Sequence, residues 1–415
     1  MNVNTIPGLV IPLLLLAGCA GFVPAPPAWR MAAAGHCPAL PPPSGPTVTV
    51  STEAALRDQA YNAAPGTTIL VAPGTYDLQD AIWVVHDGVT IRGATGRRDD
   101  VILDGGGMLT WTHTHVIAID ADDVTIADLT IRNADEHGIS VQGRDRPTLY
   151  NLHILDTGYQ LVKVNPVGDG SADGLLACSC LEYTTTSPED YTNGISAHQA
   201  QRWIVRDNVW RRIRTPGNAP VPTILFWSGS SDTIVERNLL VDCYQGIAFG
   251  NASHGPGDHT GGVVRNNMIY AAQPHDSVIE MVHATGWLVA NNTALLLNPD
   301  GLDWGLEARF PDTQGTFACN LTNMRIWNDR DGAQGVLTGN LTNAQASWFA
   351  NPAAADLHLK ATATNAIDHA ASLPQVTDDY DGQPRPSGPA PDVGADEYGA
   401  ITYSHFVYLP LVLKG

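Results

Sequence analysis

The sequence is poor in positive charge. It contains 22 Lys and Arg residues against 42 Asp and Glu residues, which gives a formal net charge of −20 at pH 7. Lysine is especially scarce, with three in 415 residues. A negative charge on this scale argues against nucleic acid and against an anionic membrane surface as partners. We therefore predict an acidic, soluble protein that binds no nucleic acid.

Several common enzyme motifs are missing. The sequence has no HExxH, no GxxxxGK[ST] phosphate-binding loop and no GxSxG. Each of these patterns carries a particular chemistry, so their absence argues against those enzyme classes and against no others.

Cysteine is also sparse, with six residues and no CxxC pair. Cys19 lies in a targeting segment described below, and an odd number remains: Cys37, Cys178, Cys180, Cys243 and Cys319. In an oxidising compartment these five cannot all pair within one molecule, and their pairing stays open. Cys178 and Cys180 alternate along one stretch, which favours buried thiols over a metal site.

Charged residues make up 15% of the chain, while glycine (40) and proline (29) are abundant. This balance is typical of many short strands joined by turns rather than of helical bundles. We expect an all-β protein.

The N-terminus contains the apolar run GLVIPLLLLAGC, which is too short to span a bilayer and ends in small residues. It predicts a cleaved signal peptide over residues 1–18. LAGC resembles the lipobox of bacterial lipoproteins, and this resemblance implies a lipid anchor on Cys19, although MNVNTIPG lacks the usual basic residue. Plain secretion and an uncleaved anchor remain alternatives. The Pro/Ala-rich residues 19–46 are interpreted as a tether, which places the protein outside the cytoplasm, at the cell surface or secreted.

A repeat of about 28 residues follows. Segments such as VERNLLVD, VRNNMIYA and VANNTALL superpose on one polar or small residue followed by a short apolar strand. Such short strands bury a face only when successive coils stack, which predicts a solenoid. Asparagine at this position suits a left-handed turn and a ladder of amide hydrogen bonds. The aligned positions are Asp128, Asn151, Cys180, Asn208, Asn238, Asn267, Asn292, Asn320 and Asn340.

The stretch EAALRDQAYNAAPGTTILVAPGTYDL, together with VTIRG and the repeats, resembles the pectate-lyase-like superfamily. The resemblance covers residues 47–350 and implies a single-stranded right-handed parallel β-helix with an N-terminal capping helix. The superfamily includes lyases, glycoside hydrolases, epimerases and non-enzymatic adhesins, so the fold alone does not give the function. Residues 351–399 resemble the closing segment of bacterial surface β-helix proteins with variable anchors, and we expect them to cap the open end. Residues 400–415 form an apolar tail that suits a sorting signal or an edge strand.

Alternation along the strands predicts which side chains share an outward column. Aligning TIRNADEHGISV with HILDTGYQLVKV and the following coils gives two columns. The first contains Ser140, Lys163, Ser196, Leu225, Ala248, Glu280 and Glu307; the second contains Gln142, Asn165, His198, Trp227, Gly250, Val282 and Arg309. Long coil connections lie beside this face, and loops of this kind usually wall a binding groove.

The side chains of these two columns suit the processing of an acidic polysaccharide. We expect the protein to act as a monomer. β-Elimination from a uronic acid needs a base for the C5 proton and a positive group that neutralises the adjacent carboxylate. Lys163 and His198 are the candidate bases. The candidate substrate-binding residues are Asn165, Ser196, Trp227 as a sugar platform, and Arg211 and Arg214 of the RRIR run as neutralisers.

Other interpretations remain open. A surface lysine commonly serves solubility, and His198 suits a ladder hydrogen bond, which would leave a non-catalytic glycan-binding or adhesive surface protein. Glu280 and Glu307 could instead form the carboxylate pair of a glycoside hydrolase. Two weaker metal patterns are the HGPGDH loop with His254, Asp258 and His259, and Ca²⁺-binding turns built from Asp120, Asp122, Asp123, Asp169 and Asp173.

Overall fold

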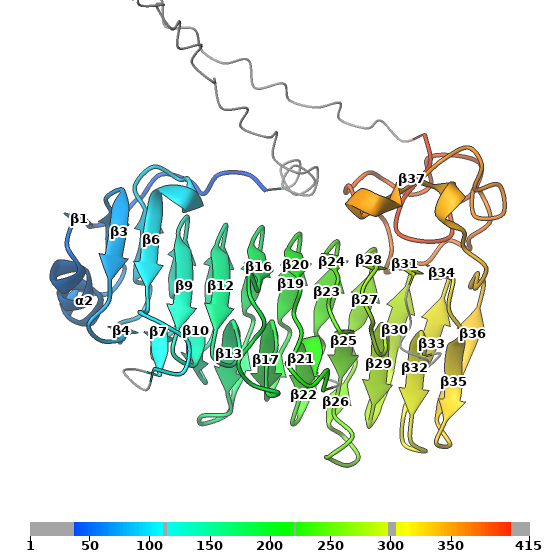
Figure 1. Cartoon of the computed structure of the whole chain (residues 1–415), viewed down its shortest axis with the longest axis horizontal. Helices are drawn as coiled ribbons and strands as arrows, with labels where there is room; N and C mark the ends of the chain where they lie inside the picture. The colour runs from blue at the N-terminus through cyan, green and yellow to red at the C-terminus, as the bar shows by residue number, and fades with distance from the viewer. Residues whose placement is uncertain (1–36, 111–113, 220, 298–303, 400–415) are drawn as a thin grey trace, which may run out of the picture.

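The computed structural model describes residues 37–110, 114–219, 221–297 and 304–399. The predicted signal peptide, the anchor at Cys19 and the apolar tail over 400–415 lie outside these residues. Within them the chain winds into a right-handed parallel β-helix (Figure 1) built from sheets of 16, 10 and 10 strands, with a separate two-stranded sheet. The predicted fold class is confirmed.

The coils contribute strands to three faces, which we name sheets A, B and C, and several coils place two short strands in sheet A. The strands of sheet A are β1 (Thr47–Val50), β2 (Thr68–Val71), β5 (Thr90–Gly93), β8 (Thr125–Ala127), β11 (Thr148–Tyr150), β14 (Ser171–Ala172), β15 (Leu175–Ala177), β18 (Ala200–Gln201), β19 (Ile204–Arg206), β22 (Ser230–Ser231), β23 (Ile234–Glu236), β26 (His259–Thr260), β27 (Val263–Arg265), β30 (Ala284–Ala290), β33 (Gln314–Ala318) and β36 (Gln334–Thr338). Those of sheet B are β3 (Gly74–Asp77), β6 (Val101–Asp104), β9 (Thr130–Ala134), β12 (His153–Thr157), β16 (Cys180–Glu182), β20 (Val209–Arg211), β24 (Leu239–Val241), β28 (Met268–Ala271), β31 (Thr293–Leu296) and β34 (Leu321–Thr322). Those of sheet C are β4 (Ile82–Val84), β7 (His115–Ile119), β10 (His137–Gln142), β13 (Val162–Asn165), β17 (Ile195–His198), β21 (Pro222–Trp227), β25 (Gln245–Phe249), β29 (Ile279–Val282), β32 (Leu306–Arg309) and β35 (Ile326–Arg330). The remaining elements are α2 (Glu53–Asn62), the 3-10 turns η2 (Arg98–Asp100), η3 (Ala346–Trp348) and η4 (Pro352–Ala354), and the antiparallel pair β37 (Phe349–Asn351) and β38 (Asp356–Leu359).

The interior is built by stacking like side chains in register. On sheet C, for example, Ile195 pairs with Ile224, which pairs with Ile247, and all three are fully buried. β-Branched residues suit such a column because their shape packs well on a pleated surface. At the N-terminal end, helix α2 buries Leu56 and Ala60 against the first coil and so closes the core, as predicted.

A column of asparagine amides runs through the coils where sheet A turns into sheet B. The Nδ2 atom of Asn208 donates to Oδ1 of Asn238 at 3.1 Å. The same bond repeats at 2.9–3.0 Å down the column through Asn267, Asn292, Asn320 and Asn340. The predicted amide ladder is confirmed over these six coils.

The left-handed turn and the ladder are neighbouring positions rather than one. Positive φ angles occur at the residue before each ladder asparagine, namely Asp207, Arg237, Asn266, Asn291, Cys319 and Gly339. Asp128 and Asn151 belong to this turn column, and Ser179, not Cys180, continues the ladder by donating its backbone N–H to Asn208 Oδ1. The predicted alignment was therefore wrong by one residue in those three coils, because both positions are polar in several coils and the pattern does not separate them.

The closing segment packs on the side of the solenoid. Its Leu357 and Val393 share an apolar cluster with Leu239, Met268 and Leu295, which come from successive strands of sheet B. Figure 1 shows the segment beside β28, β31 and β34. The outward face of sheet B is apolar in these coils, so covering it removes apolar surface from water.

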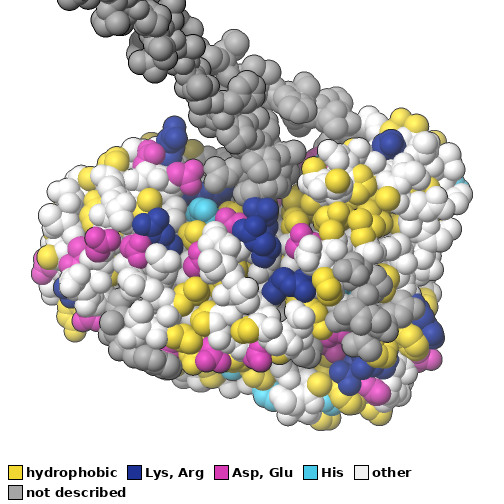
Figure 2. Space-filling model, in the orientation of Figure 1, with side chains coloured by type: hydrophobic (Ala, Val, Ile, Leu, Met, Phe, Trp, Pro, Cys, Tyr) yellow, Lys and Arg dark blue, Asp and Glu magenta, His cyan; other side chains and the backbone are white. Residues whose placement is uncertain are grey.

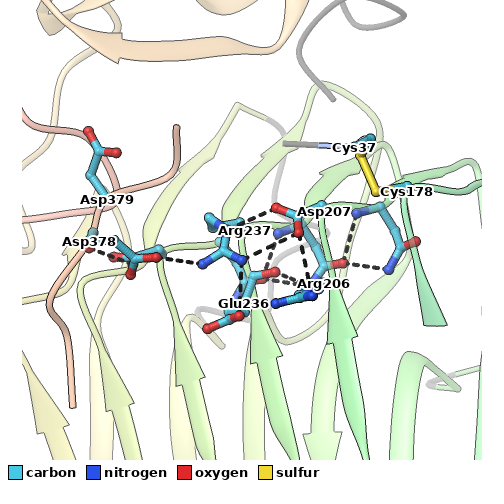
Figure 3. A network of polar contacts seen from close by, with 12 residues as sticks. Cys37, Cys178, Arg206, Asp207, Glu236, Arg237, Asp378 and Asp379 are labelled. Atoms are coloured by element: carbon cyan, nitrogen blue, oxygen red, sulfur yellow. Dashed lines mark hydrogen bonds and ion pairs between the residues drawn. A yellow bond between two sulfur atoms is a disulfide. The ribbon is translucent and has the colours of Figure 1, made fainter. Parts of the chain in front are cut away.

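The last coil is correspondingly open. Val336 and Leu337 of β36 are 58% and 46% exposed. The prediction that residues 351–399 cap the open end is therefore wrong: they cover the flank instead. Within the segment, the buried Arg385 pairs with Glu397, while Arg237 of the solenoid donates to Asp378 at 2.7 Å (Figure 3).

A disulfide fastens the start of the described chain across several coils. Cys37 is bonded to Cys178, 141 residues away (Figure 3). Tyr150 Oη donates to the Pro38 carbonyl at 2.6 Å, and Arg92 donates to that of Pro41 at 2.8 Å. The part of the predicted tether from residue 37 onward therefore lies on the solenoid.

The prediction of a buried thiol at Cys178 is wrong, because Cys178 occupies the turn column rather than a strand and is oxidised. Cys180, Cys243 and Cys319 are buried and reduced, as expected of core thiols.

Charge on the surface is mixed. Figure 2 shows acidic and basic side chains lying next to one another over the face in view. Arg144 pairs with Asp120, and Arg146 pairs with Asp123. Further along the chain, Arg202 pairs with Asp173. Among the described residues, no helix is long and apolar enough to cross a membrane.

His259 should make the stability of the fold depend on pH. It is fully buried, its ring stacks on Phe249 with centroids 4.0 Å apart, and burial lowers its pKa to about 3. The unfolded chain therefore takes up a proton first as the pH falls below about 6.5, and the stability due to neutral His259 is lost down to about pH 3. Between pH 7 and pH 5 the loss is about 2 kcal/mol.

We expect His259→Phe, which keeps a ring on Phe249, to remove this dependence. The free energy of unfolding in urea should be compared at both pH values. The wild-type advantage over the variant should shrink by about 2 kcal/mol at pH 5; a difference that does not change with pH would contradict a neutral, buried His259.

Candidate functional site

The predicted outward columns of sheet C are confirmed. Ser140 pairs with Lys163, Lys163 with Ser196, and Ser196 with Leu225. The same register continues through Ala248 and Glu280 to Glu307. In the second column, His198 pairs directly with Trp227.

Lys163 is covered rather than spread into solvent. The residue is 7% exposed, and its Nζ atom lies 2.9 Å from His198 Nε2 and 3.2 Å from Tyr191 Oη. The ammonium also lies 5.5 Å from the centre of the Tyr191 ring. Burial lowers the pKa of Lys163 to about 8, because a charged amine loses hydration in a covered position.

His198 is the partner that keeps this amine in place. Burial, and then the charges of Lys163 and His254, lower the pKa of His198 to about 4. The imidazole is therefore neutral near pH 7, and its Nε2 can accept a hydrogen bond from Lys163. The two candidate bases, Lys163 and His198, are therefore in direct contact.

Trp227 lies between two histidine rings. Its ring centroid is 4.4 Å from that of His198 and 4.5 Å from that of His254, and its Nε1 donates to Ser196 Oγ at 3.3 Å. Asp258 in turn holds His254 in place, with its Oδ1 atom 2.7 Å from His254 Nδ1.

The HGPGDH residues do not form the suggested metal site. His259 stacks in the core on Phe249 and bonds Thr233, away from the His254–Asp258 pair.

A row of rings leads along sheet C to Lys163. Consecutive ring centroids lie 5.4–6.3 Å apart through Trp83, His115, His137, Tyr159 and Tyr191. Trp83 and Tyr191 are 39% and 45% exposed. Flat, partly exposed rings can cover the apolar faces of pyranose sugars.

Tyr191 was not predicted. It lies in the connection between β16 and β17, one of the long coil connections expected to wall this face. The alternation of apolar and polar residues predicts which strand side chains point outward. It does not predict where a loop residue such as Tyr191 lies.

The polar side chains next to Lys163 form a small network. Asn165 Nδ2 donates to Ser140 Oγ at 3.0 Å and to Gln142 Oε1 at 3.2 Å. Ser196 accepts from Trp227, as described above. Lys163, His198, Asn165, Ser196 and Trp227 therefore lie on adjacent coils, as predicted.

The two predicted arginines are placed elsewhere. Arg211 lies on β20 of sheet B, where its guanidinium is 3.2 Å from Glu182. Arg214 donates to the carbonyls of Asp242 and Pro274 and lies over the Tyr244 ring. They do not join Lys163, because β20 faces a different side of the solenoid from β13.

Glu280 and Glu307 lie opposite one another on β29 and β32, four and five coils from Lys163. Arg309 is 3.3 Å from Glu280, and Arg330 pairs with Glu307. Burial raises the pKa of both carboxyls, and the neighbouring Glu280 charge helps to bring that of Glu307 to about 7. The pair therefore holds a proton near neutral pH.

Three of the five aspartates suggested for Ca²⁺ binding form close ion pairs. Asp120, Asp123 and Asp173 each bind an arginine at 2.7 Å, so their carboxylates are already neutralised. Within the described residues, the Lys163 amine makes its polar contacts with a phenol and an imidazole.

No protein-family model matches the sequence, and no curated protein matches it. Solved structures do match in fold. A pectate lyase, Pel9A, aligns with a TM-score of 0.60 and 12% identity over 88% of this chain and 98% of its own. The tailspike protein of E. coli bacteriophage HK620, solved with a pentasaccharide, aligns with a TM-score of 0.51 and 13% identity over 73% of this chain and 60% of its own.

At this identity the likeness shows the fold alone. The chain has the right-handed parallel β-helix fold that these two proteins share.

Proposed function

We propose that this protein cleaves an acidic polysaccharide by β-elimination on the outward face of sheet C, with Lys163 as the base. The observation that carries the proposal is the covered Lys163 amine, which touches both a neutral imidazole and a phenol and has a pKa of about 8. A base with a pKa close to the working pH is effective in proton transfer.

The roles follow from the protonation states. Neutral Lys163 takes the C5 proton of a uronate, the C4–O bond breaks, and a double bond forms between C4 and C5. Burial raises the pKa of Tyr191, so its hydroxyl remains protonated and can donate to the leaving oxygen. His198 holds the amine in position by its hydrogen bond.

The uronate carboxylate must be stabilised while charge develops on it. Arg211 and Arg214 lie away from Lys163 and are given no part in this step. The amides of Asn165 and Gln142 lie beside the column and can donate hydrogen bonds to the carboxylate after exchanging their present partners. The assay described next includes Ca²⁺ as an additive, and the proposed mechanism assigns no step to this ion.

The experiment is a change in ultraviolet absorbance. The unsaturated uronate product absorbs, and the substrate does not. Alginate, pectate and glycosaminoglycans should be tested with and without added Ca²⁺. We expect a rise with at least one polymer; binding to a polymer without any rise would favour the non-catalytic, adhesive alternative.

Tyr191→Phe tests the proposed acid. The variant keeps the ring beside Lys163 but loses the hydroxyl, so we expect kcat to fall about 100-fold with KM within about twofold. Tyr61→Phe on helix α2, which is 57% exposed, is the matched control and should not change either constant. A larger effect on KM than on kcat would assign Tyr191 to binding only.

A glycoside hydrolase site at Glu280 and Glu307 is the second candidate. It is favoured by their adjacent placement and by the proton that they hold near neutral pH. Two carboxyls on neighbouring strands, about 5 Å apart, suit a retaining mechanism. Release of reducing ends without ultraviolet absorbance, abolished by Glu307→Gln, would identify this activity.

We also propose an extracytoplasmic location. The Cys37–Cys178 disulfide supports it, since such bonds persist mainly in oxidising compartments. The lipid anchor on Cys19 and the monomeric state stay predictions.

A further inference from the structure

The closing segment brings together three side chains that can bind a metal ion, on a flank remote from sheet C. They are His358 on β38, Asp381 in the turn after Tyr380, and Asp396 near the end of the segment. One ligand atom from each lies within 4.8 Å of the other two. His358 Nε2 is 3.1 Å from Asp381 Oδ2.

A fourth residue orients the histidine. Asp356 Oδ1 lies 2.6 Å from His358 Nδ1, which fixes the ring and directs Nε2 toward Asp381. A metal-binding histidine in proteins usually has its other ring nitrogen on a carboxylate or carbonyl in this way.

The charge at this place is unbalanced. Asp356, Asp381 and Asp396 surround a single imidazole, Asp396 is 5% exposed, and Asp379 is buried nearby. The buried arginine of the segment, Arg385, is already paired with Glu397. Burying several carboxylates together is costly unless a cation is present.

We propose that His358, Asp381 and Asp396 bind one divalent transition-metal ion, for which Zn²⁺ is the best fit, and that Asp356 positions His358. One nitrogen and two carboxylate oxygens suit Zn²⁺ better than Ca²⁺ or Mg²⁺, which prefer oxygen ligands alone. A water molecule completes a tetrahedral site. Ligand atoms around tetrahedral Zn²⁺ lie about 3.3 Å apart, so the His358–Asp381 separation fits and Asp396 closes in on binding.

The ion would join three separate parts of the closing segment. The described segment contains one antiparallel strand pair, β37–β38, and two isolated bridges. The three parts are otherwise joined by single hydrogen bonds, such as those from the Tyr380 N–H to the Ala395 carbonyl and from the Leu359 N–H to Asp396 Oδ2, both at 2.7 Å. Because the unfolded chain does not hold these ligands together, the free energy of metal binding stabilises the folded segment. The metal would therefore help to hold the segment against sheet B.

A second group elsewhere shows the contrast. His153, Cys180 and Glu182 also place ligand atoms within 4.8 Å of one another. There, however, Arg211 and Arg212 both pair with Glu182, at 3.2 and 3.4 Å. Two guanidinium groups already neutralise that carboxylate and repel a cation, which is why the proposal is confined to the closing segment.

The test uses the full chain, which is stripped of metal with a chelator and then titrated with Zn²⁺ against a competing chelator dye. We expect one equivalent to bind. His358→Gln and Asp381→Asn should each weaken that binding at least about 100-fold, and Asp356→Asn about 10–100-fold. Asp329→Asn, which changes an exposed aspartate on β35, is the matched control and should bind as wild type.

Two further readouts separate a specific site from general histidine binding. Co²⁺ in place of Zn²⁺ should give the visible spectrum of a four-coordinate ion in wild type and not in Asp381→Asn. Zn²⁺ should raise the unfolding temperature of wild type and leave that of Asp381→Asn unchanged, with circular dichroism confirming that both are folded. No binding by folded wild type, or binding by His358→Gln and Asp381→Asn that is as tight as that of wild type, would overturn the proposal.

Discussion

Replacing Lys163 with alanine is expected to lower kcat/KM for elimination by about 10²–10⁴-fold, the usual contribution of a general base. The amine of Lys163 is covered and contacts both His198 and Tyr191. Truncation removes the proton acceptor and leaves the sheet intact, since the strand is held by backbone bonds to β10 and β17. The ultraviolet assay of the unsaturated product measures the loss.

Lys360 offers a matched control. It is exposed in the closing segment, so Lys360→Ala changes the charge equally without touching sheet C. We expect wild-type rates from it. Equal rates for Lys163→Ala and wild type, in a variant that still binds polymer, would exclude Lys163 as the base.

The pH profile tests the same residue independently. The amine must lose its proton to act as a base, and the pKa of Lys163 is lowered to about 8. kcat/KM should therefore rise with pH and level off above about pH 8. A profile that is flat from pH 6 to pH 9 would contradict this assignment.

Strand residues of the site could be predicted because alternation and coil length are enough to set the register. Lys163, Ser196 and His198 follow from aligning short segments, and the structure pairs Lys163 with Ser196, which lies two residues before His198 on β17. The arginines could not be placed in this way. Arg211 is close to β21 in sequence, but it belongs to sheet B, and the next strand of the coil faces another direction.

The disulfide and the docking of the closing segment were harder to predict than the coils. Cys37 is 141 residues from Cys178, and no local pattern links them. The closing segment could be identified by resemblance, but its docking face depends on which outward residues of sheet B are apolar. That face is built from Leu239, Met268 and Leu295, one from each of three coils.

The amide ladder carries the second large expected effect, on stability. Asn267 is fully buried, and its Oδ1 accepts from the backbone N–H of Asn238 at 3.0 Å and from the Asn238 amide at 3.0 Å. Its own Nδ2 donates to Asn292 and to the Val235 carbonyl at 2.9 Å. Alanine at this position would leave buried donors and acceptors unpaired on both adjacent coils.

Each orphaned buried group costs about 1–3 kcal/mol, so Asn267→Ala should destabilise the protein by about 3–4 kcal/mol. Asn340→Ala is the informative comparison. Asn340 is the last rung, partly exposed, and water can replace its bond to Asn320. Its loss should cost about 1 kcal/mol.

Urea unfolding, followed by circular dichroism, measures both. A smaller effect at Asn267 than at Asn340 would mean that the ladder does not contribute to stability through buried bonds. A larger effect at Asn267 would show that successive coils depend on one another through this column, because one missing amide unpairs groups above and below it.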